Sequence, residues 1–413
     1  MIVSDVSRST TGGISRTKWL GIGLFFFVTS ILRSWNSIHH LIPDPGLQFQ
    51  IAAWSDGPSD IFGSFWGYPQ VAPRAISEFL NLVPIAQLTY WSTLATTAIT
   101  AICALAISIS LVRTINPWIA GLAGLSLVIA FPAYESLIGN IWAIRWILLP
   151  TTCIIVATEF AKQHWRFTFL LFLITGLSHA YIVIPAGIFV WRIFFERDRS
   201  LRMLLLGSVL VATTTFQGLA FLLGSRQSRL YGEATVYWPW PGSGIYWLTI
   251  FLVPIGFAFV AISFTFLSSR SKSKLWSPSI AIALQANLLA VLSYLQLGIK
   301  SSAAVTTVTV SYIALIVSAS DGTGITTRFN LNKIVAIGGS LILLVLCTHY
   351  YFASPYITFG TRWSETVGQA RDSCLVFGTR EVELIYFKAG NLINSEILGC
   401  DVLENWNKWF FHR

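Results

Sequence analysis

The run Trp19-Leu-Gly-Ile-Gly-Leu-Phe-Phe-Phe-Val-Thr-Ser-Ile-Leu32 carries no charge, and two basic residues, Arg16 and Lys18, come just before it. With its flanks the apolar segment covers residues 17–35. An α-helix needs about 20 such residues to cross a hydrocarbon core of about 30 Å. The chain then continues as Arg33-Ser-Trp35, where a secretory leader would have a small-residue cleavage site. We therefore expect a retained first membrane span.

Similar apolar runs recur along most of the chain. Apolar residues make up 54% of the 413 residues, charged residues only 11%, and the mean hydropathy is +0.66. A soluble domain would carry about a quarter charged residues. The sequence predicts an all-α polytopic membrane protein with about eleven transmembrane helices, and between about nine and twelve would fit almost as well. The expected spans are residues 17–35, 86–112, 117–134, 145–161, 165–178, 180–195, 203–224, 244–268, 276–298, 303–319 and 334–352.

The positions of the basic residues predict the orientation of the chain. With a cytoplasmic N-terminus, fifteen of the 27 basic residues lie in inner segments, six in outer loops and six in the C-terminal tail. The positive-inside rule favours this arrangement. We expect a multi-pass protein of the plasma (inner) membrane with an extracytoplasmic C-terminus. The net charge of +9 then reflects topology. Because the basic residues form no single patch, we expect no nucleic-acid partner.

One outer connection is much longer than the others before the tail. This first outer loop covers residues 36–84 and holds three aspartates and several aromatic residues. Segments 47–54 and 73–82 have apolar faces and predict two short helices along the outer membrane interface. The predicted organisation is therefore a transmembrane domain over residues 1–352 and a small extracytoplasmic tail over residues 353–413.

The common motifs of soluble enzymes are missing from the sequence. It has no P-loop, no dinucleotide-binding glycine motif, no HExxH and no CxxC. The histidines do not cluster at ligand spacing, so we expect no protein-built metal site, although the scattered aspartates neither require nor exclude a divalent cation. No other cofactor follows from the sequence. The outer segments do offer a carboxylate that can act as a general base, arginines that can bind phosphate, and aromatic faces that suit sugar rings.

The architecture resembles the GT-C superfamily of integral membrane glycosyltransferases. The shared features are an inward N-terminus, one span, a long acidic outer loop with interfacial helices, and then a series of short-looped spans. The stretches Gly67-Tyr-Pro-Gln-Val-Ala-Pro-Arg74, Gly139-Asn-Ile-Trp142 and Arg145-Trp146 also resemble bacterial envelope proteins of this shape. The resemblance covers most of the chain up to about residue 350. It implies that a sugar is taken from a polyprenyl-phosphate donor on the outer face.

The resemblance also implies that the catalytic acid lies in the first outer loop. Asp44 is the best match by position, Asp56 is the next candidate, and Asp60 is the third. Each has a structural alternative: Asp44 can cap a helix, and the other two can bond the backbone of their own turn.

Residues for binding the donor phosphate or the substrate come from several outer segments. Arg74 can instead pair with Glu78, and Arg145 with Glu135. The full set of binding candidates is Tyr68, Arg74, Arg145, His179, Arg226, Arg229 and Trp238. These segments are expected to converge over the first loop on the outer face.

The cysteines fall into two groups. Cys103, Cys153 and Cys347 lie in apolar spans and are expected to be small buried hydrophobic residues. Cys374 and Cys400 lie in the tail, in an oxidising compartment, and a bridge between them would staple a unit too small for a good core. The alternative is two unpaired thiols.

The expected function is transfer of a sugar from a polyprenyl-phosphate donor to an envelope glycan, lipid or protein acceptor. The partners are then the lipid-linked sugar, the acceptor and the lipid bilayer. Two alternatives stay open: a transporter or flippase of a lipid-linked envelope precursor, and a non-catalytic envelope assembly protein that docks through its tail. A transporter would need ionisable residues within its spans, and few are visible here.

Overall fold

The computed structural model describes most of the N-terminal half of the chain and parts of the C-terminal half. The described residues are 16–39, 49–50, 53, 57–65, 68–129, 141–196, 200–223, 277–295, 306–307, 309–314, 316–317, 362–378, 380–389, 392–400 and 403. They are mostly helical, as the sequence predicts.

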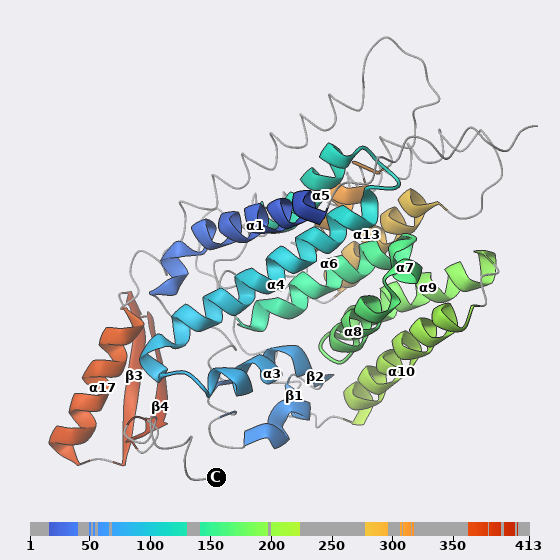
Figure 1. The fold of residues 1–413 in the computed structure, drawn as a ribbon. Coiled ribbons are helices and arrows are strands. Elements are labelled where there is room, and N and C mark those ends of the chain that lie inside the picture. The colour runs from blue at the N-terminus through green and yellow to red at the C-terminus, as the bar shows by residue number, and fades with distance from the viewer. Residues whose placement is uncertain are drawn as a thin grey trace, which may run out of the picture.

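Long apolar helices make up the body of the molecule. In Figure 1, α1, α4 and α6 lie side by side, and α8, α9 and α10 form a second group beside α6. The bounds are α1 Arg16–Arg33, α4 Leu88–Leu111, α5 Pro117–Ile129, α6 Ile144–Ala157, α7 Phe160–Gln163, α8 Trp165–Gly176, α9 Val183–Glu196, α10 Leu201–Leu223 and α13 Pro278–Leu295.

These helices fall on the predicted spans wherever the structure describes them. Ile85–Leu111 and Leu201–Ala220 are long and apolar enough to cross a membrane, and several of the other helices are apolar but shorter. The expected spans at 244–268 and 334–352 lie outside the described residues, and 303–319 is described only in part. The structure therefore shows a mostly helical protein with two helices of spanning length among its described residues, and the count of about eleven spans stays a prediction.

Local sequence explains where α5 begins, and α6 contains a proline. The α5 helix starts at Pro117, a favoured first helical residue, and the side chain of Asn116 accepts a hydrogen bond of 2.9 Å from the backbone N–H of Trp118. The α6 helix contains Pro150 in its interior, which neighbouring helices tolerate in an apolar bundle.

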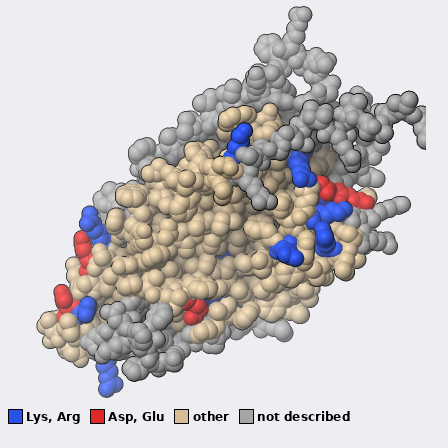
Figure 2. Space-filling view, viewed as in Figure 1, with Lys and Arg blue, Asp and Glu red and all other residues tan. Residues whose placement is uncertain are grey.

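Charged side chains are distributed unevenly over the surface. Figure 2 shows Lys, Arg, Asp and Glu mostly near two ends of the visible face, with a broad band of other residues between them. Exposed aromatic residues also lie near both ends: Trp35, Tyr90 and Trp91 at one, and Trp118, which is 85% exposed, toward the other. Trp91 and Leu111 are separated by about 30 Å of helix, the thickness of a hydrocarbon core. This distribution supports a membrane location.

Helices α4 and α5 approach each other closely at Gly124. A Cβ atom there would overlap the backbone oxygen of Ala104 and the side-chain oxygen of Ser108. Gly121, one turn earlier on the same helix, has open space at the corresponding position. Only glycine therefore allows this approach at position 124 without a shift of the helices.

Substituting Gly124 with alanine is expected to lower the stability of the protein by about 1–3 kcal/mol, because the added methyl group must push α5 away from α4. Gly121→Ala is the matched control and should leave the melting temperature in detergent unchanged or slightly raised, since alanine favours the helix. Equal melting temperatures for the two variants would contradict the close packing at Gly124.

The two ends of the bundle differ in what covers them. We call the end that holds the C-terminus of α1, the start of α4 and the start of α6 the loop end. The other end, which holds Arg192 and the C-terminus of α9, is the basic end.

At the basic end Arg192 is 1% exposed and donates to the backbone oxygens of Val156 at 3.1 Å and Thr158 at 2.5 Å. It also pairs with Glu159 at 2.5 Å and Glu196 at 2.8 Å. The side chain of Arg192 thus caps the C-terminus of α6.

The first outer loop folds onto the loop end. The described elements of the loop and its two ends are η1 Trp35–Ile38 at its start, η2 Gly57–Phe62, β1 Ser64–Phe65, β2 Tyr68–Pro69 and α3 Val71–Leu80 within it, and η3 Ile85–Gln87 just after it. The predicted helix 73–82 is confirmed and begins two residues earlier. Of the predicted helix 47–54, the structure describes Phe49, Gln50 and Ala53, which are helical.

The C-terminal tail contains strands, so the all-α prediction is wrong for this part of the chain. Helix α17 Trp363–Phe377 ends at Gly378, which has a φ of 60°. The antiparallel strands β3 Glu381–Ala389 and β4 Leu392–Gly399 follow it. Several branched and aromatic residues in β3 favour an extended chain, and glycine supplies the left-handed helix end.

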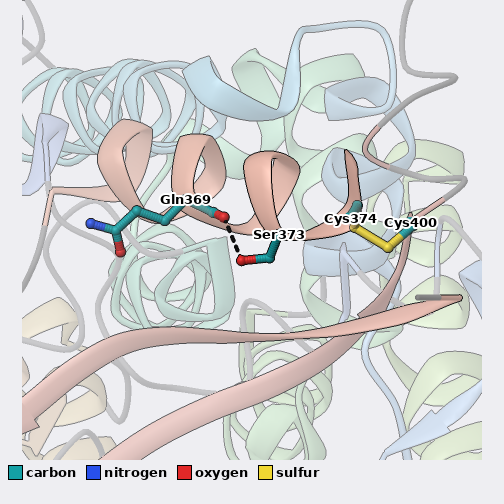
Figure 3. The surroundings of a disulfide bond; sticks show 4 residues. All are labelled: Gln369, Ser373, Cys374 and Cys400. Carbon is teal, nitrogen blue, oxygen red and sulfur yellow. Dashed lines mark hydrogen bonds between the residues drawn. A yellow bond between two sulfur atoms is a disulfide. The ribbon is translucent and has the colours of Figure 1, made fainter. Parts of the chain in front are cut away.

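A disulfide closes the tail unit. The sulfur atoms of Cys374 and Cys400 are bonded, as the sequence predicts, and they join the last turn of α17 to the end of β4 (Figure 3). Cys103 and Cys153 are free and buried. Cys347 lies outside the described residues.

Candidate functional site

The segment from β2 to α3 is fixed to the end of helix α8. The backbone N–H of Val71 donates to the oxygen of Leu177 at 3.2 Å, and that of Ala72 donates to the hydroxyl of Ser178 at 2.8 Å. The side-chain amide of Gln217, on α10, donates to the backbone oxygens of Pro69 at 3.3 Å and Gly176 at 2.9 Å. These bonds hold the first outer loop against two helices of the bundle.

Arg145 lies where this segment meets the start of α6. It follows the short helix η5 Ile141–Ala143 and is 0% exposed. Its Nη1 donates to the hydroxyl of Tyr68, from the first outer loop, at 2.6 Å. Its guanidinium carbon lies 4.2 Å from the ring centre of Trp142 and 5.2 Å from that of Trp146. The rings and the hydroxyl therefore position this cation.

His179 lies next to this cation, in the turn between α8 and η6 Ala180–Ile182. Its ring centre is 4.3 Å from that of Trp146 and 5.1 Å from that of Tyr181. Burial, and secondarily the charge of Arg145, hold the pKa of His179 well below its ordinary value. The imidazole is therefore neutral at physiological pH.

The tautomer of His179 follows from a hydrogen bond that its ring accepts. Its Nδ1 accepts from the backbone N–H of Tyr181 at 3.1 Å, so the proton of the neutral ring is on Nε2. Among the described residues, this buried Nε2–H finds no acceptor. The turn thus presents a hydrogen-bond donor beside the Arg145 guanidinium.

We call Tyr68, Trp142, Arg145, Trp146 and His179 the arginine cluster. It offers a cation, a phenol and a neutral imidazole donor in one buried place at the loop end. Guanidinium groups bind phosphate oxygens through two parallel hydrogen bonds, and aromatic neighbours keep the group fixed. The cluster is therefore suited to an anionic group such as a phosphate.

Arg74 lies elsewhere on the first outer loop. It is buried on α3, and its guanidinium carbon lies 5.1 Å from the ring centre of Phe49. Asn81 ties the same part of the loop to the end of α3. It accepts from the amide of Gln50 at 2.5 Å and donates to the backbone oxygen of Ala53 at 3.1 Å. The segment that precedes Asp56 is thus anchored to α3.

The structure brings together part of the predicted site. Tyr68, Arg145 and His179 meet in the arginine cluster, as expected from their outer segments. The predicted site residues Asp44, Asp56, Arg226, Arg229 and Trp238, and also Glu135, lie outside the described residues.

Two residues that hold the site were missed. Gln217 could have been identified from the sequence, because a glutamine inside an apolar helix usually has a buried hydrogen-bond partner. Asn81 could not have been identified in this way, because asparagine is common in loops. In the part of the chain that the structure describes, no three His, Cys, Asp or Glu residues lie close enough to hold a metal ion.

No protein-family model matches the chain, and no curated protein matches it at a significant level. The function proposed below therefore depends on the geometry of the loop end and on the chemistry of its residues.

Proposed function

We propose that this protein is a membrane glycosyltransferase of GT-C-like architecture. It takes a sugar from a polyprenyl-phosphate donor and transfers it to an envelope glycan, lipid or protein acceptor on the outer face of the plasma membrane. The N-terminus is cytoplasmic, the first outer loop and the tail are extracytoplasmic, and about eleven helices span the bilayer. The observation that carries the proposal is Arg145, fully buried at the loop end and bonded to Tyr68 of the first outer loop.

In this proposal Arg145 binds the donor phosphate. The lipid phosphate is the leaving group of the transfer, and a guanidinium stabilises the negative charge that develops on its oxygen as the bond to the sugar carbon breaks. The hydroxyl of Tyr68 and the Nε2–H of His179 can donate to the remaining phosphate oxygens. His179 is neutral, so it binds without adding charge.

A carboxylate of the first outer loop is the general base of the proposed reaction. It removes a proton from the acceptor hydroxyl as that oxygen attacks the sugar carbon. Asp44 is the first candidate and Asp56 the second, with Asp60 third. The described segments on both sides of Asp56, which contain Ala53 and the start of η2, contact α3 or its C-cap residue Asn81. These contacts hold the described segments next to Asp56 against α3.

The proposal is tested with purified protein in nanodiscs and a panel of radiolabelled polyprenyl-phosphate sugars. We expect saturable binding of one donor and, with a suitable acceptor, release of the free lipid phosphate. Asp44→Asn should keep donor binding and lose release, because the base does not hold the phosphate. Binding of no donor by folded protein would contradict the proposal and favour a transport or assembly role.

A further inference from the structure

One residue of the tail unit, which is made of α17, β3 and β4, bonds to both ends of the first outer loop. Trp363, the first residue of α17, is 0% exposed. Its backbone N–H donates to the oxygen of His39 at 2.9 Å, and its indole Nε1–H donates to the oxygen of Ile85 at 2.7 Å. His39 follows η1, where the loop begins, and Ile85 opens η3, where the loop has just ended. Trp363 therefore bridges the entrance and the exit of the loop.

The loop ends are also joined directly. The hydroxyl of Thr89, in the first turn of α4, donates to the oxygen of Ile38 at 2.7 Å. Trp363 adds to this link from a position 278 residues beyond Ile85 in the sequence. A loop of about fifty residues gains most from such closure, because its free ends would otherwise have a large conformational freedom.

The tail unit is built so that Trp363 stays in place. The N–H of Cys400 donates to the oxygen of Arg380 at 2.9 Å, which closes the end of the strand pair. The disulfide from Cys374 then holds the last turn of α17 to that end, as Figure 3 shows. Helix α17 also packs against β3. The helix that carries Trp363 is thus part of one cross-linked unit rather than a free arm.

We infer that Trp363 is a positioning residue, which holds the ends of the first outer loop together. The disulfide-closed tail unit keeps Trp363 in the position that this role requires. This role is intramolecular and differs from docking of an assembly partner. By holding its two ends together, Trp363 restricts the conformations of the loop that contains Tyr68 of the arginine cluster. The consequence for sugar transfer rests on the proposed function, whereas the consequence for the loop itself does not.

Trypsin can report on the loop directly. Arg74 is the only lysine or arginine between Arg33 and Arg113, and it is buried on α3. Cleavage after Arg74 therefore requires the loop to open locally, and its rate follows the open fraction when opening is fast. Mass spectrometry of the peptides measures this cleavage in the full-length protein in nanodiscs. Cleavage after the exposed Arg202, at the other end of the bundle, serves as an internal control.

Trp363→Phe keeps the aromatic ring and removes the donor to Ile85. We expect cleavage after Arg74 to rise by about tenfold, because a buried carbonyl loses its partner, while cleavage after Arg202 stays constant. The pair Cys374→Ser and Cys400→Ser should act in the same direction. Trp91→Phe is the matched control. Its indole also bonds at the loop end, to Gln87 at 3.2 Å, but the bond is exposed and joins no loop ends.

A transfer assay adds a readout that depends on positioning. At saturating donor, Trp363→Phe should lower kcat while the donor Kd changes by less than about threefold, because Arg145 on α6 remains in place. The inference is overturned if cleavage after Arg74 is unchanged in Trp363→Phe, or if cleavage after Arg202 rises equally. Absence of transfer in the wild type would count against the proposed function alone, since the proteolysis result stands without it.

Discussion

Replacing Arg145 with glutamine is expected to weaken donor binding by about a hundredfold, because the phosphate loses a charge-assisted pair of hydrogen bonds. Glutamine is neutral and its amide ends about where Nε of arginine lies, so the variant loses both the positive charge and the donor that reaches Tyr68. The loss of binding therefore reports the whole guanidinium group. Equilibrium binding of the radiolabelled donor measures the effect. Arg145→Lys should also bind weakly, since an ammonium group lacks the planar pair of donors.

Arg192 provides the matched control for this prediction. Both arginines are almost fully buried, but they lie at opposite ends of the bundle, and the described partners of Arg192 are two carboxylates and two carbonyls of the chain itself. Arg192→Gln should leave the donor Kd unchanged once the protein is folded. Equal losses of binding in the two variants would mean that Arg145 acts only through stability.

Replacing Arg192 with methionine is expected to lower the free energy of unfolding by about 3 kcal/mol, because the backbone oxygens of Val156 and Thr158 lose their donor in a buried place. Glu159 is 57% exposed, so its lost ion pair adds little. The C-terminus of α6 should fray first. Thermal unfolding in detergent measures the loss.

A second variant separates the two parts of this effect. Glu159→Gln removes the exposed ion pair and leaves both carbonyl contacts in place, so it should cost less than about 1 kcal/mol. A larger loss of unfolding free energy for Glu159→Gln than for Arg192→Met would contradict this account. It would show that the ion pair, and not the capping of α6, stabilises this end.

Local sequence patterns predicted several of the described helices. The α4 helix follows from a long uncharged and mostly apolar run, and α3 follows from an apolar face next to polar residues. The turn at His179 and the start of α6 were expected on the same face, because short helices that alternate in direction return to it. These features depend on neighbours a few residues apart, and such patterns are visible in one sequence.

The contacts that hold the loop end could not be predicted in the same way. Arg145 and Tyr68 are 77 residues apart, Gln217 and Pro69 are 148 apart, and Trp363 and Ile85 are 278 apart. Each pair depends on how the helices pack, and no local pattern states which partner a buried donor will find. The strands of the tail were missed because the surrounding composition favoured helices.

The position of the donor phosphate tests the central claim most directly. The measurement is a structure of the full chain in nanodiscs at a saturating concentration of the polyprenyl-phosphate donor. We expect the phosphate within about 3 Å of the Arg145 guanidinium and the Tyr68 hydroxyl, with the lipid leaving the loop end toward the bilayer. A phosphate bound elsewhere, with the arginine cluster unchanged, would contradict the claim that this cluster is the donor site.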